Sequence, residues 1–208
     1  RIDCDLPINK GRILDNSRLI KSVGTIRLLL EKGNKIMIIG HMGRPKPGQV
    51  VLGKPENYDI EYSLRPVYLE LMSILEENGS SVESVFLEDV LERGKIAEAI
   101  EVNQILFFEN LRFWKDEEEN NHEFLRYVME IASCFVNDAF AVAHRENASI
   151  TLWQKMETYY GLSFIEEVAK IDKALTDPER PLAVVLGGAK KDKLDYLEEL
   201  ANKADWVL

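Results

Sequence analysis

The sequence predicts an α/β fold built on a three-layer, doubly wound, mostly parallel sheet. Short apolar runs such as 36–39 (IMII) and 105–108 (ILFF) show no polar alternation, which is typical of strands buried on both faces. Between them lie stretches whose apolar residues recur at helical spacing. Alternating strands and helices of this kind indicate a Rossmann-like sheet covered by helices, and the pattern restarts near the end of the chain as the beginning of a second α/β domain.

Residues 1–6 alternate in character and predict a first strand, with Arg1, Asp3 and Asp5 on one face. A helix follows that begins at Asp15 or Asn16 and ends before Gly33. The further elements expected in this half are a strand at 35–39, a long loop at 46–62, a helix from Ser63 to Gly79, a short strand at 85–87 and a short helix at 96–100.

The second half continues the same alternation. Its expected elements are a strand at 104–108, an acidic loop at 116–119, a helix with Phe124, Val128 and Ile131 inward, a strand at 134–136, a helix at 162–175, a strand at 182–186, a helix carrying Leu194, Leu197 and Leu200, and a strand that opens at Trp206. Asp177-Pro178 closes a helix before the pattern restarts, so we expect an N-terminal domain at 1–160, an interdomain helix at 161–178 and the start of a C-terminal domain at 179–208.

Composition narrows the class of protein. The 208 residues carry a formal net charge of -10 and are 46% hydrophobic, which is typical of a globular chain and unfavourable for nucleic-acid or anionic-membrane partners. No apolar run approaches the ~18 residues of a membrane helix. Two isolated cysteines, Cys4 and Cys134, are expected to be buried free thiols of a reducing compartment, the cytoplasm. Both ends of the chain read as interrupted strands, so we expect a piece of a longer protein.

Basic residues recur directly after the apolar runs, where the carboxyl ends of parallel strands meet and ligands bind. An arginine offers a rigid fork that matches phosphate or carboxylate, and several arginines at one edge repel one another without an anion between them. The sequence therefore predicts a site for a small anionic ligand. Its members are Arg1, Asp3, Asp5, Arg18, His41, Arg44, Arg112, His144 and Arg145, with Lys190, Lys191 and Lys193 after the last run.

Each residue also has an ordinary structural interpretation. A single arginine is commonly a solvated surface charge, and His144 by itself is more often a packed structural histidine. Asp3 and Asp5 also fit a structural pair. The GGAK segment at 187–190 suits a phosphate at a helix N-terminus, but it equally fits a tight strand-to-helix turn. It is neither GxxxxGK[ST] nor GxGxxG. Recurrence at successive strand ends is what favours the ligand site.

The motifs resemble those of phosphoglycerate kinase, in the order and with spacing similar to that family's, along nearly the whole chain. The matching segments are RIDCDLP, DNSRL, GHMGRP, YSLRPV, ENLRF, VNDAFAVAHR and VLGGAK. The resemblance covers the family's N-terminal domain, the linking helix and only the beginning of its C-terminal domain.

This resemblance implies a glycolytic kinase, a cytoplasmic monomer that transfers a phosphoryl group reversibly between ATP and the carboxylate of 3-phosphoglycerate. Mg would accompany ATP or ADP, with its ligands outside this segment. The resemblance assigns Asp3, Asp5, Arg18, His41, Arg44, Arg112 and Arg145 to phosphoglycerate, and Gly187, Gly188, Lys190 and Lys193 to the nucleotide. Arg18 and Lys190 would be the catalytic residues, near the transferring group. Domain closure would exclude water.

The chain departs from the family pattern at several positions. Asp5 stands where the family has Asn, Ala141-Val142 where it has Gly-Thr, and Asn147 where it has a second His. One residue is missing after GGAK, so the lysines fall at i and i+3, and Lys191 competes with Lys193 for the role. These departures keep open an alternative, a non-catalytic phosphoglycerate-binding or regulatory homologue. In either case we expect this segment alone not to catalyse.

Overall fold

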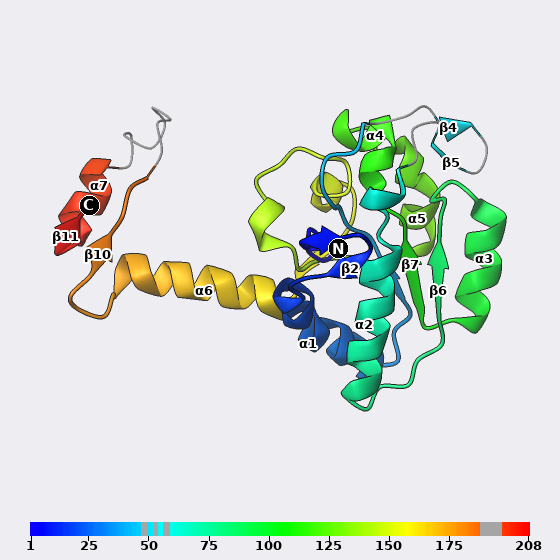
Figure 1. Cartoon of the computed structure of the whole chain (residues 1–208), viewed down its shortest axis with the longest axis horizontal. Helices are drawn as coiled ribbons and strands as arrows, with labels where there is room; N and C mark the ends of the chain where they lie inside the picture. Colours follow the sequence, from blue (N-terminus) through cyan, green and yellow to red (C-terminus); the bar gives the residue numbers. More distant parts are fainter. Residues whose placement is uncertain (47–49, 52–53, 56–58, 188–196) are drawn as a thin grey trace. The chain divides into compact units, whose positions relative to one another are not determined.

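The computed structural model describes residues 1–46, 50–51, 54–55, 59–187 and 197–208 (Figure 1). The chain divides into two compact units, Arg1–Phe164 and Ile165–Leu208. None of the described helices is long and apolar enough to cross a membrane.

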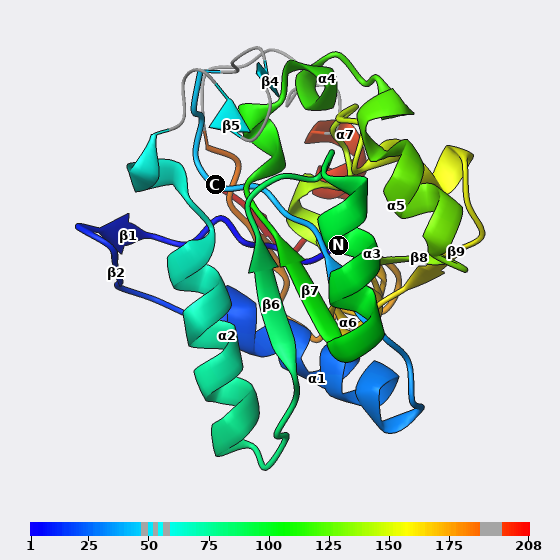
Figure 2. The same ribbon diagram turned by 90° about the vertical axis from the view of Figure 1, so that its right-hand side faces the viewer.

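A parallel sheet forms the centre of the first unit (Figure 2). Its strands are β3 (Ile36–Ile38), β7 (Ile105–Phe108) and β6 (Ser84–Leu87), in the order β3-β7-β6. Ile105 of the central strand pairs with Ile36 on one side and with Ser84 on the other. The predicted α/β fold with a parallel sheet is confirmed.

Strand β7 is buried on both faces, as its unbroken apolar run predicts. Ile105 and Phe107 face one core, where they pack with Leu19 and Leu71. Leu106 and Phe108 face a second core on the other side. The helices that contribute to the first core are α1 (Ser17–Glu31) and α2 (Arg65–Glu77), and those of the second are α3 (Arg93–Val102) and α5 (Arg126–Ile131).

A second parallel pair consists of β8 (Phe135–Asn137) and β9 (Thr158–Tyr160). Strand β9 escaped the sequence analysis because its residues are half-buried or exposed and so form no apolar run. After β8, the carboxylate of Asp138 accepts hydrogen bonds from Phe164 N (3.0 Å) and Ser163 Oγ (2.8 Å). Asp138 thereby supports the start of α6 (Leu162–Thr176).

The strand predicted over residues 1–6 is wrong in extent. Only Ile2 forms a ladder contact, an isolated parallel bridge to Asp138. The expected alternation holds for Ile2, Cys4 and Leu6, which are buried, but Arg1 is buried as well. The side chain of Arg1 has polar partners in the interior, so the alternation of polar and apolar residues could not predict that it is buried.

The remaining elements of this unit are short. The loop expected at 46–62 contains a described hairpin and a 3-10 turn, and the expected single helix around Phe124 is divided in two. These elements are β1 (Ile8–Asn9), β2 (Arg12–Ile13), β4 (Val50–Val51), β5 (Lys54–Pro55), η1 (Ile60–Tyr62), η2 (Leu111–Phe113), α4 (Lys115–Glu118), η3 (His122–Leu125), η4 (Phe140–Val142) and η5 (Thr151–Gln154). Cys4 is a buried free thiol as predicted, whereas Cys134 is only partly buried.

The second unit carries the restart of the strand–helix pattern. Strand β10 (Ala183–Val184) pairs in parallel with β11 (Trp206–Val207), and α7 (Leu197–Lys203) precedes β11. Leu194, which was expected on this helix, lies outside the described residues. Helix α6 crosses the boundary between the two units, and the division at 160 and 178 stays a prediction.

Candidate anion-binding site

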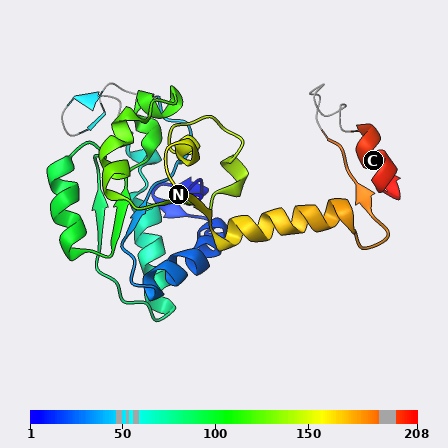
Figure 3. The ribbon, with the colours of Figure 1, turned by 180° about the vertical axis from the view of Figure 1, so that it is seen from behind.

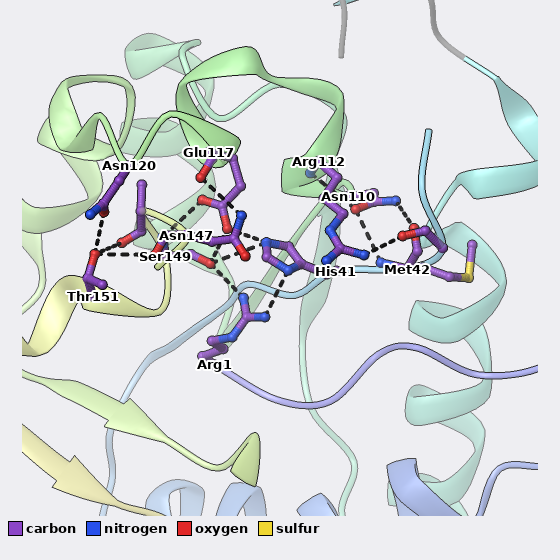
Figure 4. A network of polar contacts seen from close by, with 12 residues as sticks. Arg1, His41, Met42, Asn110, Arg112, Glu117, Asn120, Asn147, Ser149 and Thr151 are labelled. Carbon is purple, nitrogen blue, oxygen red and sulfur yellow. Dashed lines mark hydrogen bonds and ion pairs between the residues drawn. The ribbon is translucent and has the colours of Figure 1, made fainter. Parts of the chain in front are cut away.

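Asn110 joins the carboxyl ends of β3 and β7 (Figure 4). Its side-chain amide donates to the carbonyl oxygens of Met42 (2.7 Å) and Tyr62 (3.0 Å). Its side-chain oxygen accepts from the backbone N–H groups of Met42 and Arg112, each at 3.2 Å. Because Asn110 is fully buried, these bonds fix the loops that carry His41 and Arg112 relative to each other.

Arg112 is the most enclosed of the predicted arginines, with 6% of its surface exposed. Its guanidinium donates to the carbonyl oxygen of Gly43, while its buried Nε has no partner among the described residues. Burial and the neighbouring guanidinium of Arg145 lower the pKa of Arg112, while the carboxylate of Asp5 acts in the opposite direction. Two cationic groups thus lie close together at the ends of β7 and β8.

Arg44 and Arg145 complete this group. Arg44 follows Gly43 directly and its side chain is exposed, and Arg145 is half-buried in the segment after β8. Within the described part of the chain, neither these two arginines nor Arg112 forms an ion pair with a carboxylate. We call Arg44, Arg112 and Arg145 the arginine cluster.

Arg18 and the two aspartates form a second group beside the loop after β3. The guanidinium of Arg18 lies 3.6 Å from an oxygen of Asp3 and donates to the carbonyl oxygen of Asp5 at 3.0 Å. The carboxylate of Asp5 accepts from Gly43 N at 2.9 Å. Gly43 therefore touches both groups, since its own carbonyl receives Arg112.

His41 occupies the interior rather than an open surface. It is 4% exposed, and both ring nitrogens have partners. Nδ1 lies 3.1 Å from Arg1 Nη2, which can only donate, so Nδ1 is the acceptor. Nε2 contacts a carboxylate oxygen of Glu117 and therefore carries the hydrogen. His41 is thus a neutral histidine with a fixed tautomer.

Glu117 accepts most of the hydrogen bonds in this network (Figure 4). One carboxylate oxygen accepts from Ser149 Oγ (2.6 Å) and the other from Ser149 N (2.9 Å). Arg1 in turn donates to Ser149 Oγ at 2.6 Å. We call Arg1, His41, Glu117 and Ser149 the buried network.

The charges of the buried network follow from its enclosure. Desolvation, with the charge of Arg1 beside it, lowers the pKa of His41 to about 4. Burial by itself raises the pKa of Glu117, but hydrogen bonds and charge from His41, Arg1 and Ser149 outweigh it, and the net pKa lies below its ordinary value. At neutral pH the network therefore pairs one guanidinium with one carboxylate, and His41 lies neutral between them.

The structure brings part of the predicted set together. Gly43 links the loop of Arg44 to Asp5 and Arg112, and Arg145 lies near Arg112. His41 belongs to the buried network. On the nucleotide side, Gly187 is exposed in the second unit, while Gly188, Lys190, Lys191 and Lys193 lie outside the described residues.

Sequence reasoning missed Glu117, Ser149 and Asn110. Glu117 sits in a run of four acidic residues, 116–119, and nothing in the sequence separates it from its neighbours. Asn110 was noted only as part of the ENLRF motif at 109–113, of which Arg112 alone was assigned to the site. Among the described residues, no group of three or more His, Cys, Asp or Glu side chains gathers to hold a metal ion.

Comparison with known proteins gives one consistent family. The sequence profile described as phosphoglycerate kinase matches residues 1–208. A protein of Leptospira biflexa serovar Patoc named phosphoglycerate kinase is 36% identical over 210 residues, which cover 100% of this chain and 50% of the relative. A protein of the same name from Bartonella bacilliformis is 35% identical over 210 residues, with the same coverage.

Solved structures agree. Phosphoglycerate kinase from Coxiella burnetii matches with a TM-score of 0.72 and 31% identity, over 100% of this chain and 49% of that one. The enzyme from Pyrococcus horikoshii OT3 matches with a TM-score of 0.76 and 27% identity, over 100% and 50%. This chain therefore spans about half the length of its relatives. With a profile match over its entire length and a shared fold, the chain belongs to the phosphoglycerate kinase family.

Proposed function

We propose that the first unit binds 3-phosphoglycerate or 1,3-bisphosphoglycerate. The protein to which this chain belongs would then transfer a phosphoryl group reversibly between ATP and the carboxylate of 3-phosphoglycerate. Family membership supports the reaction, and the arginine cluster supports the anionic substrate. Phosphoryl transfer needs positioning and charge stabilisation more than covalent help, which a set of guanidinium groups supplies.

The single observation that carries the proposal is the state of Arg112. Its guanidinium is largely desolvated next to Arg145, and its Nε has no partner in the part of the chain that the structure describes. A desolvated cation beside a second cation is unfavourable unless an anion compensates. A phosphate or carboxylate that lies between the two arginines would accept from both.

The other residues take supporting roles in this proposal. Asp3, Asp5, Arg18, His41 and Arg44 would complete the substrate site, with His41 holding its loop through the buried network. Arg18 would also stabilise the transferring phosphoryl group. Gly187, Gly188, Lys190 and Lys193 would face the nucleotide, with Lys190 near the transferring group. The described residues offer no Mg cluster, so we assign no step through the metal to this chain.

The acidic net charge of the chain supports the absence of nucleic-acid and anionic-membrane partners. Membership of the family supports a cytoplasmic monomer. The alternative, a non-catalytic phosphoglycerate-binding homologue, is favoured by one observation. The carboxylate of Asp5 faces the site from its bond to Gly43 N and opposes the local positive potential.

Calorimetric titration of 3-phosphoglycerate into the 208-residue chain tests the substrate. We expect binding that Arg112→Lys weakens by roughly 10- to 100-fold, because lysine replaces the planar fork by a point charge. Arg44→Ala should weaken it as well. Arg126→Ala is the matched control, because Arg126 pairs with Glu123 and Glu130 on the surface of α5. If both cluster variants bind like the unaltered chain, the site is wrong.

A coupled assay with ATP and 3-phosphoglycerate separates binding from catalysis. We expect no turnover by this segment alone, because the chain spans about half the length of the relatives it matches. Turnover by these 208 residues would contradict that expectation.

A further inference from the structure

Glu117 connects the three segments that carry the arginine cluster (Figure 4). It lies in the segment that follows Arg112, after the end of β7. Its carboxylate contacts His41, which lies in the same loop after β3 as Arg44. The same carboxylate also contacts the segment after β8, which carries Arg145. One buried residue therefore joins the loops that follow β3, β7 and β8.

The connection to the segment after β8 uses both the side chain and the main chain of Glu117. Its carboxylate oxygens accept from Ser149 N at 2.9 Å and from Ser149 Oγ at 2.6 Å. Its backbone carbonyl accepts from Ala148 N at 3.0 Å and from the side-chain amide of Asn147 at 3.3 Å. These bonds fix the segment shortly after Arg145, so they also restrict where Arg145 lies.

The connection to the loop after β3 returns to the same carboxylate. The ring of His41 donates to Glu117, and its other nitrogen accepts from Arg1 at 3.1 Å. Arg1 also donates to Ser149 Oγ at 2.6 Å, which closes the buried network into a ring of contacts. Figure 3 shows residue 1, marked N, in the interior of the first unit. A shift of any one segment would leave a buried polar group unpaired, so the ring resists it.

The arginine cluster needs such a constraint. Arg145 is the neighbouring charge with the largest effect on the pKa of Arg112, so the two guanidinium groups lie close together and repel each other. An anion that accepts from both requires them at a fixed spacing, since a misplacement of about 1 Å at a positioned site can cost roughly 100-fold. A fully buried carboxylate is costly to desolvate, and its contacts with all three segments give a reason for that cost.

We propose that Glu117 is a positioning residue of the anion site, which sets the spacing of Arg44, Arg112 and Arg145 by holding their three segments together. This role rests on the proposed function, since it assumes that the arginine cluster binds the substrate anion. Glu117 is fully buried and acts through the segments, not by contact with the ligand. Its negative charge opposes anion binding only weakly, because its effect on the pKa of Arg112 is smaller than that of Asp5.

The first test removes a hydroxyl from each of two buried residues in the same turn. Ser149→Ala removes a donor to Glu117, whereas Thr151→Val removes a hydroxyl whose shortest contacts are with Asn120 (2.6 Å) and His122 (2.9 Å). We expect Ser149→Ala to weaken 3-phosphoglycerate binding by roughly 10-fold in calorimetry, because the clamp on the segment after β8 loosens. Thr151→Val should cost stability but leave the dissociation constant unchanged.

A double-mutant cycle separates positioning from a general loss of stability. Glu117→Gln is combined with Arg145→Lys, and the four chains are titrated with 3-phosphoglycerate where urea unfolding shows each to be folded. We expect Glu117→Gln to weaken binding roughly 30-fold by itself but less than about threefold in the chain that carries Arg145→Lys, because a flexible point charge depends less on spacing. Leu75→Ala, in α2 and the first core, is a control of similar destabilisation and should leave binding unchanged.

The outcomes distinguish the positioning role from the site itself. If Arg112→Lys weakens binding while Ser149→Ala and Glu117→Gln do not, the anion site stands and Glu117 does not position it. An equal loss from Glu117→Gln with and without Arg145→Lys, or an equal loss from Leu75→Ala, would assign the effect to stability and also contradict positioning. Binding that is insensitive to Arg112→Lys would remove the site, and the positioning role with it.

Discussion

Glu117 holds His41 in a single protonation and tautomeric state inside the first unit. The ring donates from Nε2 to the carboxylate of Glu117 and accepts at Nδ1 from Arg1. A histidine whose two ring nitrogens are both hydrogen-bonded in this way cannot also bind a ligand without losing one of these buried hydrogen bonds. Its contribution to anion binding is therefore to fix the loop that ends in Gly43 and Arg44.

Glu117→Gln should destabilise the chain by about 2–4 kcal/mol. The amide nitrogen of glutamine faces a donor, either the ring of His41 or the backbone of Ser149, and Arg1 loses its buried counter-charge. Urea unfolding measures the loss. Glu119→Gln is the control, because Glu119 pairs with Lys115 at the surface and its removal should change little. Equal stability of the two variants would show that the network does not hold the fold.

Acid should destabilise the chain through His41. In the unfolded chain the ring takes a proton below its ordinary pKa of 6.5, but in the folded chain only near pH 4. The unfolded state thus binds more protons in this window, so the contribution is full above pH 6.5 and is lost as pH falls toward 4, by about 3 kcal/mol. The pKa of Glu117 is also lowered in the folded chain, so this carboxylate likewise costs the chain stability as the pH falls further.

Urea unfolding between pH 7.5 and 4.5 measures this slope. His41→Gln should flatten it, because glutamine does not titrate. His144→Gln is the matched control, since His144 is exposed and outside the buried network, and it should keep the slope. A slope that survives in His41→Gln assigns the acid sensitivity to another group.

Asp5→Asn should tighten 3-phosphoglycerate binding by roughly fivefold, which is what removing one exposed negative charge about 4 Å from an anion is worth in water. The side-chain oxygen of asparagine still accepts from Gly43 N, so the loop keeps its conformation. Glu31→Gln is the control, because it removes an equal charge on α1 where Glu31 pairs with Arg27. Calorimetry at two salt concentrations checks that the gain is electrostatic. Weaker binding by Asp5→Asn would mean that the carboxylate itself supports the site.

Gly43→Ala should cost about 2 kcal/mol or more. Gly43 has φ of 57°, and an added Cβ would lie 2.5 Å from Cδ1 of Tyr62. The carbonyl that receives Arg112 would shift with it, so anion binding should fall together with stability. Gly94→Ala, in α3 with open space around it, should be neutral or slightly stabilising in the same urea series. Equal effects at both positions would remove the special role of Gly43.

The fold followed closely from local patterns. The apolar runs at β3 and β7 have side chains on both faces, and Phe107 and Phe108 duly point into opposite cores. The apolar residues of α2, such as Leu71 and Leu75, are fully buried as their spacing predicts. Strand β9 was missed because it owes its place to pairing with β8 and not to its own hydrophobicity.

The candidate site was predictable in composition but not in arrangement. Arg112 and Arg145 could be placed at one edge because parallel strands end on the same side. The internal position of His41 could not, because its partners Arg1 and Glu117 are 40 and 76 residues away in the chain.

The sequence by itself determined the α/β class, the family resemblance and the set of basic residues at the strand ends, because these depend on periodicity and on residues adjacent in the chain. Only the tertiary structure decided which of four consecutive acidic residues is buried, namely Glu117, and which protonation state of His41 it enforces. Burial, and the desolvation that shifts a pKa, arise from segments that meet only after folding, so local sequence patterns do not contain them.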